Sequence, residues 1–353
     1  MGRALAQALA QNRMNKIKSL FDEVFVRDFF RKELLKFYPG FIDIGQIKIT
    51  PYKNMVWETT YHVVLSFKVR LLGAGGEEKD VSIVCSAHSS EERKNVYDGL
   101  SYLWGKDFPN DEFDLPKPLF YSEYFRGVFY QAIEGENLLY YIKERDWRTV
   151  EKMIKSSGTL FARLHSLPAE AETNFNPYNA RIPTVIPGIE LIFKEMGQRY
   201  DNKYNEALIK IYDRLIAAED KFFSSGQPLT FIHGDAHAEN IIKTGRERIG
   251  LIDFTDLCLA DFARDLGTFL QQVEYKIVLK IGRKCLARRM KRIFLRSYLK
   301  ASGRQMTKDL RARINLYYNW TAVRTATFYF LKFGHDEVLA KELLEEVKKN
   351  LKI

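Results

Sequence analysis

Residues 231–254 carry the side chains whose types and spacing could do chemistry. An apolar run enters a loop that holds two histidines, two acids and an asparagine, and a second apolar run leaves it. The chain then turns and returns as a short apolar segment that ends on Asp253. This pattern predicts a strand, a loop, a strand, a turn and a third strand, with the polar groups gathered at one end. The polar residues of the loop are His233, Asp235, His237, Glu239 and Asn240.

Three of these groups suit phosphoryl transfer from a nucleoside triphosphate. Such a transfer needs one carboxylate to orient and deprotonate the acceptor hydroxyl, and oxygen ligands to hold Mg²⁺ against the phosphates. Asp235 is the candidate base, and Asn240 and Asp253 are the candidate magnesium ligands. In the alternative, Asp235 and Asn240 are turn residues that bond their own backbone. The paired Asp253 argues against that alternative.

The surrounding sequence divides into three segments. Apolar residues at helical spacing predict a helical N-terminal extension over residues 1–40. Its first thirteen residues contain two arginines and no acid, which fits a frayed terminus, a start at Met14 or a targeting extension. Residues 42–85 alternate with period two, and the whole segment 41–134 is predicted to form an antiparallel sheet with one inserted helix. Residues 135–353 are predicted to be mainly helical.

Within the second segment, turn residues separate the predicted elements. We expect strands over residues 44–49, 63–71, 81–85, 113–121 and 127–133, a loop over residues 50–54, and a helix that is capped at 89–92 and continues to Trp104.

Length and composition limit the class of protein. The chain has 353 residues, of which 46% are hydrophobic and 28% charged, as is typical of a globular protein with two domains or lobes. No apolar run approaches the roughly 20 residues that span a bilayer, so we expect a cytoplasmic protein without a membrane span. Isolated cysteines indicate neither a disulfide framework nor a zinc knuckle. The remaining histidines share no metal-ligand spacing.

Positive charge is concentrated between Lys276 and Arg313. The formal net charge is +10, and this stretch holds fourteen Lys and Arg residues with Asp309 as the only acid. Such a run can be a solvated face, a footprint for nucleic acid or a membrane, or the wall of a site for an anionic substrate. It favours a neutral or anionic acceptor over a polycationic one, and it leaves a nucleic-acid-associated protein as an alternative.

Four ordered segments resemble the catalytic core of the aminoglycoside phosphotransferase and choline kinase-like superfamily, which are small-molecule kinases with a protein-kinase-like fold. The segments are residues 129–138, residues 160–167, the loop His233-Gly234-Asp235 with His237 and Asn240, and Ile252-Asp253-Phe254 followed by residues 261–267. The resemblance covers residues 42–270. It implies an α+β, bilobal fold with an antiparallel β-sheet N-lobe over 41–134, which binds nucleotide, and a mainly helical C-lobe over 135–353, which holds the catalytic and acceptor sites.

The resemblance also implies where the nucleotide binds. Backbone groups around Gln131 and Ile133 would bond the adenine of ATP, or the base of another NTP, and Lys53 and Asn54 would lie in a loop above the phosphates. The segment 50–57 contains no glycine, so close backbone approach to the phosphates is not expected.

Kinases of this fold usually grip the phosphates with a lysine on the third strand. The matching window, residues 81–86, holds no lysine. Lys68, on the neighbouring strand, is expected to replace it. The alternative is a catalytically weak pseudokinase that serves as a binding or scaffold protein. The presence of Asp235, Asn240 and Asp253 together favours an active enzyme.

Three further residues receive roles in the loop. Asp265 resembles the acid that pins the catalytic loop through backbone N–H groups, a positioning role without direct chemistry. His233 is expected to pack and bond the backbone, because a carboxylate already supplies the base. His237 either packs in the same way or faces the acceptor.

Overall fold

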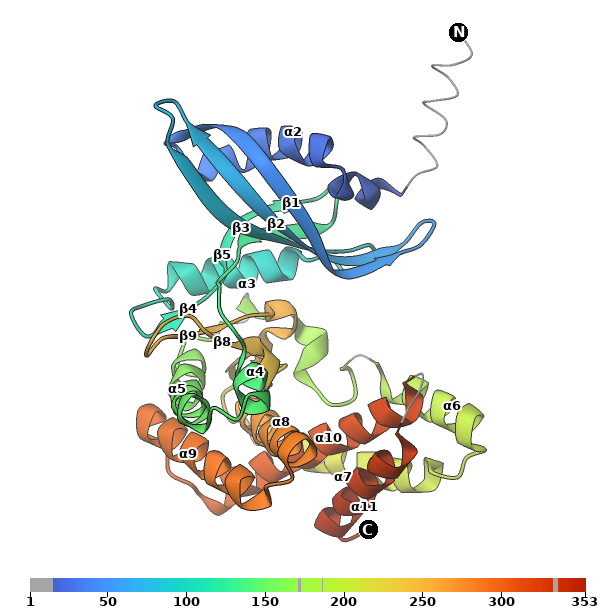
Figure 1. Ribbon diagram of the computed structural model, residues 1–353. Coiled ribbons are helices and arrows are strands. Elements are labelled where there is room, and N and C mark those ends of the chain that lie inside the picture. Colours follow the sequence, from blue (N-terminus) through green and yellow to red (C-terminus); the bar gives the residue numbers. More distant parts are fainter. Residues whose placement is uncertain (1–14, 171–172, 186, 333–335) are drawn as a thin grey trace. The chain divides into compact units, whose positions relative to one another are not determined.

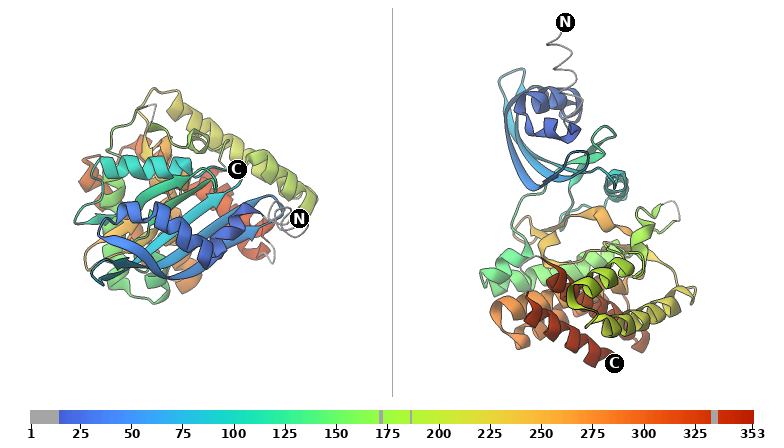
Figure 2. Two further views of the ribbon diagram at one scale, coloured as in Figure 1. Left: turned by 90° about the horizontal axis from the view of Figure 1, so that it is seen from above. Right: turned by 90° about the vertical axis from the view of Figure 1, so that its right-hand side faces the viewer.

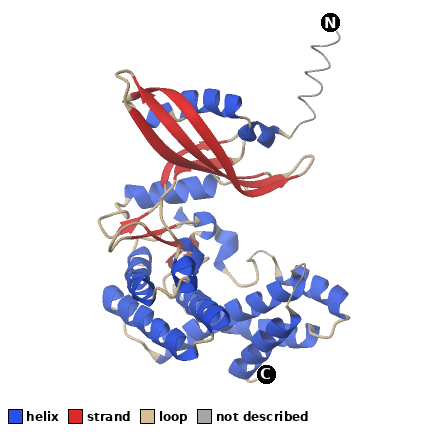
Figure 3. Cartoon of the chain, in the orientation of Figure 1, coloured by secondary structure: helices blue, strands red, loops and turns tan. Residues whose placement is uncertain are grey.

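The computed structural model describes residues 15–170, 173–185, 187–332 and 336–353, which form two compact units (Figure 1). The first unit holds residues up to 109 together with 115–133, and the second holds residues 110–114 together with those from 134 onward. Strands dominate the first unit and helices the second (Figure 3). The predicted α+β class is confirmed. The expectations for residues 1–13 fall outside the described residues.

A five-stranded antiparallel sheet forms the centre of the first unit, in the order β1-β2-β3-β6-β5. Successive side chains of each strand point to opposite faces. Val63, Leu65 and Phe67 of β2 are fully buried on one face and belong to the core of this unit. The strands are β1 (Phe41–Val56), β2 (Tyr61–Gly73), β3 (Glu78–His88), β5 (Lys117–Ser122) and β6 (Gly127–Gln131).

Helix α2 (Glu23–Glu33) covers that buried face, and the sheet curls around it (Figure 2, right). The helix starts where the Asp22 carboxylate accepts hydrogen bonds from the N–H groups of Val24 and Phe25, which satisfies donors that the first turn leaves free. Its Phe30 is fully buried and meets Phe67 edge-on, with ring centroids 5.2 Å apart. Short 3₁₀ helices precede and follow it: η1 (Lys16–Phe21) and η2 (Leu35–Phe37).

The loop predicted at residues 50–54 is wrong. β1 continues through it to Val56, and the turn into β2 lies at residues 57–60. The strand persists because a bulge at Tyr52 absorbs one extra residue and pairing with β2 then resumes. Lys53 and Asn54 are therefore strand residues.

Two other boundaries in the first unit differ from the prediction. Helix α3 (Lys94–Gly105) has Arg93 at its N-cap position, without a capping side-chain hydrogen bond, and is not capped by residues 89–92. Instead, Nδ1 of His88 accepts hydrogen bonds from the N–H groups of Ser90 and Glu91 and holds them in a turn. The strand predicted over 113–121 is divided by the prolines near its middle. Its first part, β4 (Phe113–Asp114), belongs to the second unit and pairs there with β9 (Ile249–Leu251), and its second part is β5 of the first unit.

Helices make up most of the second unit. Close packing of α5 on α9 and of α8 on α10 requires glycine: a Cβ at Gly158 would lie 2.7 Å from the Phe294 oxygen, and one at Gly267 would lie 2.6 Å from the Ile314 oxygen. Within the described residues, no helix has the length and apolarity to cross a bilayer. The elements are α4 (Leu138–Lys143), α5 (Trp147–Leu164), η4 (Pro177–Ala180), α6 (Ile189–Tyr200), α7 (Asn205–Phe223), α8 (Ala263–Ile281), α9 (Lys284–Ser302), α10 (Lys308–Leu331) and α11 (Glu337–Leu351).

Short strands between α7 and α8 frame the polar loop. β7 (Thr230–Ile232) enters the loop and pairs with β10 (Cys258–Ala260), while β8 (Ile241–Lys243) leaves it and pairs with β9. The single 3₁₀ turn η5 (Ala238–Asn240) ends the loop, and a second one, η6 (Phe254–Asp256), follows β9. The strand, loop, strand, turn and strand predicted for residues 231–254 are confirmed.

Part of the basic stretch between Lys276 and Arg313 is structural. Lys276 forms an ion pair with Glu239, and Arg313 forms ion pairs with Asp261 and Asp309. Other cations of the stretch stay exposed along α9 at four-residue intervals, namely Lys284, Arg288, Arg292, Arg296 and Lys300.

Candidate active site

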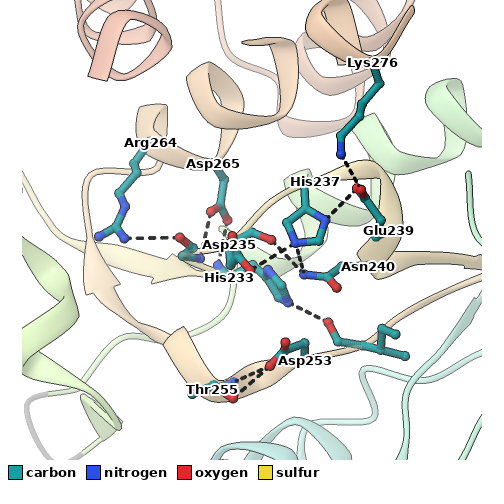
Figure 4. A network of polar contacts seen from close by, with 12 residues as sticks. His233, Asp235, His237, Glu239, Asn240, Asp253, Thr255, Arg264, Asp265 and Lys276 are labelled. Atoms are coloured by element: carbon teal, nitrogen blue, oxygen red, sulfur yellow. Dashed lines mark hydrogen bonds and ion pairs between the residues drawn. The ribbon is translucent and has the colours of Figure 1, made fainter. Parts of the chain in front are cut away.

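The loop between β7 and β8 brings together most of the side chains predicted for catalysis (Figure 4). Its entry depends on Gly234, which has a positive φ of +83°. A Cβ at this position would lie only 2.4 Å from the carbonyl oxygen of Asp256. Glycine is required here for both reasons, and the sharp turn that it allows presents Asp235 from the end of β7.

Asp265, in the first turn of α8, fixes this turn. Its Oδ2 accepts the N–H of His233 at 2.7 Å, and its Oδ1 accepts the N–H of Gly234 at 2.9 Å. The carboxylate is fully buried at a helix N-terminus, where the helix dipole favours negative charge. Burial acts to raise the pKa of Asp265, but the bond from His165 and the loop N–H groups outweigh it and lower the pKa. Asp265 is therefore ionised and anchors the loop.

His165 supports Asp265 from the end of α5. Its Nε2 lies 3.1 Å from Oδ2 of Asp265, and its Nδ1 lies 3.0 Å from the hydroxyl of Tyr298 on α9. Each of the three side chains is buried. The position of the loop is thus tied to the packing of α5, α8 and α9.

Three further hydrogen bonds hold the loop. Arg264, which is 1% exposed, donates through Nη2 to the Gly234 oxygen at 3.2 Å. His233 donates from Nε2 to the Ile252 oxygen at 2.9 Å, and the Ile252 N–H donates to the Asn240 oxygen at 3.1 Å. The end of β9, and with it Asp253, is therefore joined to the loop on both sides.

His237 lies between two carboxylates of the same loop. Its Nε2 is 3.1 Å from Oδ2 of Asp235, and its Nδ1 is 3.1 Å from Oε2 of Glu239, which also pairs with Lys276 of α8 at 2.5 Å (Figure 4). Burial acts to lower the pKa of His237, but the two carboxylates raise it well above its ordinary value. For Asp235 burial acts to raise the pKa, and the hydrogen bond and charge of His237 lower it below its ordinary value. Asp235 is held as a carboxylate beside an imidazolium.

Asn240 and Asp253 offer the oxygen atoms predicted to hold Mg²⁺. The Asn240 amide nitrogen donates to the Asp235 carbonyl at 3.0 Å, so its oxygen is the atom left to bind a cation. The exposed Asp253 carboxylate accepts the Thr255 hydroxyl at 2.8 Å. Mg²⁺ prefers oxygen ligands and often takes only one or two from the protein, so this pair fits the ion. In the described parts of the chain, no group of three or more His, Cys, Asp or Glu side chains is placed to hold a metal.

The residues predicted to contact the adenine belong to the first unit. Gln131 is the last residue of β6, and its side chain accepts a hydrogen bond from the Tyr38 hydroxyl at 3.1 Å. Ile133 lies two residues beyond the end of that strand. The main chain of Ile133 therefore lies outside the sheet.

The residues predicted to contact the phosphates lie on β1 and β2. Lys53 and Asn54 are neighbours on β1, so their side chains point to opposite faces of the sheet. Asn54 pairs with Val63, whose side chain is in the core, and Lys53 lies on the other face together with Lys68. Lys53 and Asn54, which were predicted to lie in one loop, are therefore strand residues on opposite faces of the sheet.

Three residues of the site were missed by the sequence analysis, namely His165, Arg264 and Lys276. The first two stand within residues 160–167 and 261–267, two of the segments that carry the family resemblance. That position was the signal that could have found them. The pairing of Lys276 with Glu239 joins residues 37 positions apart and leaves no local pattern.

Gly234→Ala is expected to cost about 2 kcal/mol or more of unfolding free energy and to lower the rate of any reaction at Asp235 at least tenfold. The added Cβ meets both an unfavourable φ and the Asp256 oxygen. Urea denaturation and steady-state rates measure the two effects. Gly226→Ala is the matched control, because Gly226 also has a positive φ, of +69°, but has open space around it. Equal losses of unfolding free energy and of rate in the two variants would show that the contact with Asp256 does not matter.

Solved structures with a similar fold are known. An ethanolamine kinase of Plasmodium vivax matches 85% of this chain and 81% of its own at 14% identity, with a TM-score of 0.52. The ADP-bound aminoglycoside phosphotransferase APH(2'')-Ib matches 90% of this chain and 95% of its own at 14% identity, with a TM-score of 0.53. The spectinomycin phosphotransferase APH(9)-Ia, solved with ADP and spectinomycin, matches 88% of this chain and 93% of its own at 14% identity, with a TM-score of 0.50. The predicted protein-kinase-like fold is therefore confirmed.

Sequence comparison gives the family. No curated protein is significantly similar in sequence to this chain. The family model described as phosphotransferase enzyme family matches residues 74–298, which is more than half of the chain and includes the whole polar loop. The resemblance stated from the motifs is confirmed, and the chain belongs to the phosphotransferase enzyme family.

Proposed function

We propose that the chain is an ATP- and Mg²⁺-dependent kinase that transfers the γ-phosphate to a hydroxyl group of a small-molecule acceptor. The observation that carries this proposal is the anchored loop: Asp265 binds both N–H groups of the turn that presents Asp235. Phosphoryl transfer depends mainly on positioning and electrostatics. A carboxylate that is fixed and ionised, with oxygen donors beside it, suits that reaction.

Asp235 is the proposed catalytic base. One of its oxygens receives a hydrogen bond from the His237 imidazolium, and the other is left to accept the proton of the acceptor hydroxyl. Glu239 keeps His237 charged and in place. In this arrangement His237 orients Asp235 and adds positive charge where the phosphoryl group arrives, and it does not itself take the proton.

Asn240 and Asp253 are proposed to hold Mg²⁺, which would neutralise charge on the phosphates. The nucleotide base is proposed to bond the backbone near Gln131 and Ile133. Lys53 and Lys68, which share one face of the sheet, remain predicted phosphate contacts of the first unit, whereas Asn54 lies on the opposite face. ADP in two of the structures with a similar fold supports a nucleotide as the donor.

The acceptor is proposed to be a neutral or anionic small molecule. The loop contributes carboxylates, but Arg264 and Arg324 both contact Trp320, each with its guanidinium 4.8 Å from the ring centroid. Arg324 interacts electrostatically with Asp235 and Asp256. Arginine near the catalytic base disfavours a polycationic acceptor.

ATP with Mg²⁺ is expected to raise the melting temperature, and a phosphorylation screen should find an acceptor among sugars, amino alcohols and antibiotics. Ligand at a hundred times its dissociation constant stabilises a protein by about 2.7 kcal/mol. EDTA should remove most of this shift if Asn240 and Asp253 bind the ion. No shift at millimolar nucleotide would exclude ATP as the donor. Binding of ATP without turnover of any acceptor would instead favour a pseudokinase.

A further inference from the structure

A bulge in β1 turns Lys53 onto the sheet face that α2 does not cover. Pro51 pairs with Leu65 and Lys53 pairs with Val64, so Tyr52 is the extra residue. Without the bulge, Lys53 would continue the alternation of Ile47, which is buried in the core with 2% exposure. Bulges commonly re-aim a side chain in this way. The ammonium group of Lys53 is therefore exposed on the sheet face opposite the hydrophobic core.

On this face Lys53, His62 and His88 form a row across three strands, which we call the cross-strand row. The Nζ of Lys53 lies 3.4 Å from Nε2 of His62 on β2. His62 pairs with His88 on β3, and their ring centroids are 4.6 Å apart. The ammonium group therefore leans from the edge strand inward over β2.

The cross-strand row lies beside the strand window that lacks the expected lysine. Val64, the partner of Lys53, is itself paired with Ser86 of β3. Two strand spacings, about 10 Å, separate Lys53 from Ser86, and a lysine side chain covers much of that distance. Lys79, at the start of β3, does not fill the gap, because its ammonium lies over the Tyr38 ring at 5.5 Å.

Positive charge on the row exceeds negative charge. Burial, with the charges of Lys53 and Arg93, lowers the pKa of His62 to about 4. Neutral His62 then accepts a hydrogen bond from Lys53. Arg93 is 4% exposed and pairs with Glu91 at 3.2 Å. In the described part of the chain Lys53 forms no ion pair with a carboxylate, so the row attracts an anion.

We propose that Lys53, oriented by His62 and His88, is the cation that grips the triphosphate in place of the lysine absent from β3. This inference rests on the proposed function, because it takes a nucleoside triphosphate as the ligand. Lys68 pairs with Ser82 at the other end of this window, about 13 Å along β2 from Val64, and its charge there interacts with the Asp80 carboxylate, so Lys68 is less suited to the task. A lysine binds phosphate as a point charge, which suits a long side chain that reaches in from a neighbouring strand.

Calorimetric titration of the full chain with ATP and with adenosine tests the proposal. Lys53→Ala is expected to weaken ATP binding about 10- to 100-fold, as loss of a charged phosphate contact does, and to leave adenosine binding within about twofold. His62→Ala should weaken ATP binding by less. Lys48→Ala, on the same face of β1, is the matched control and should change neither affinity. Lys53 is exposed, so its variants should fold, and circular dichroism checks this.

Three outcomes would overturn the inference while leaving the proposed function intact. One is wild-type ATP affinity in Lys53→Ala. Another is an equal loss for ATP and adenosine, which would indicate a general structural effect. The third is loss of the preference for ATP over adenosine in Lys68→Ala instead. Failure of the wild-type chain to bind ATP at all would overturn the proposed function, and this inference with it.

Discussion

Asp235→Asn is expected to lower kcat by about 10²- to 10⁴-fold, the range for loss of a general base, and to leave nucleotide affinity nearly unchanged. The amide still accepts a hydrogen bond from His237 and fills the same space, so the loop keeps its shape. The variant, however, has no carboxylate at position 235 to take the proton of the acceptor hydroxyl. Steady-state rates on the acceptor found in the screen measure kcat, and the thermal shift with ATP reports nucleotide binding.

Glu239→Gln provides the comparison for this variant. It removes a neighbouring charge of the same loop but leaves the base in place, and it weakens the hold on His237 and Lys276. We expect kcat to fall by less than about tenfold, since His237 then still orients Asp235. If Asp235→Asn kept a rate within about threefold of the wild type, Asp235 would not be the base. If Glu239→Gln lost as much as Asp235→Asn, the charge of the network would matter more than proton transfer.

Spacing within one short segment was enough to predict the polar loop. Asp235 and Asn240 are close because Asn240 ends a single turn of 3₁₀ helix that begins three residues after Asp235, and Asp253 joins them through an adjacent hairpin. Local sequence determines such arrangements, since turn residues and short apolar runs leave few alternatives. The family resemblance supplied the role of Asp265, which no local pattern would reveal, because Asp265 is about thirty residues from the N–H groups it binds.

Contacts between distant elements were beyond the reach of the sequence. Residues 50–54 contain a proline and an asparagine, which normally indicate a loop, but pairing with β2 and a bulge keep them extended. Pairing energy across the sheet outweighs the local turn signal there. The same applies to His165, whose partners Asp265 and Tyr298 are 100 and 133 residues away.

Asp265→Ala is expected to lower the free energy of unfolding by about 3–5 kcal/mol, the usual cost of removing one partner from a buried charged network. Three donors lose their acceptor at once: the N–H groups of His233 and Gly234 and the ring of His165. Each sits in a buried environment where water does not replace the carboxylate. Urea denaturation measures the loss. Asp309→Ala, which removes an exposed partner of Arg313, should cost no more than about 1 kcal/mol.

Asp265→Asn separates the positioning role from the stability of the fold. The amide keeps one acceptor but turns an NH₂ group toward a donor, so one of the two loop N–H groups is left unsatisfied. We expect the variant to fold at low temperature with its nucleotide affinity largely kept, and kcat to fall about tenfold or more, because the turn no longer holds Asp235 in one position. Normal kcat in a folded Asp265→Asn variant would mean that Arg264 and His233 alone fix the loop, since they hold its Gly234 oxygen and the end of β9 independently of Asp265.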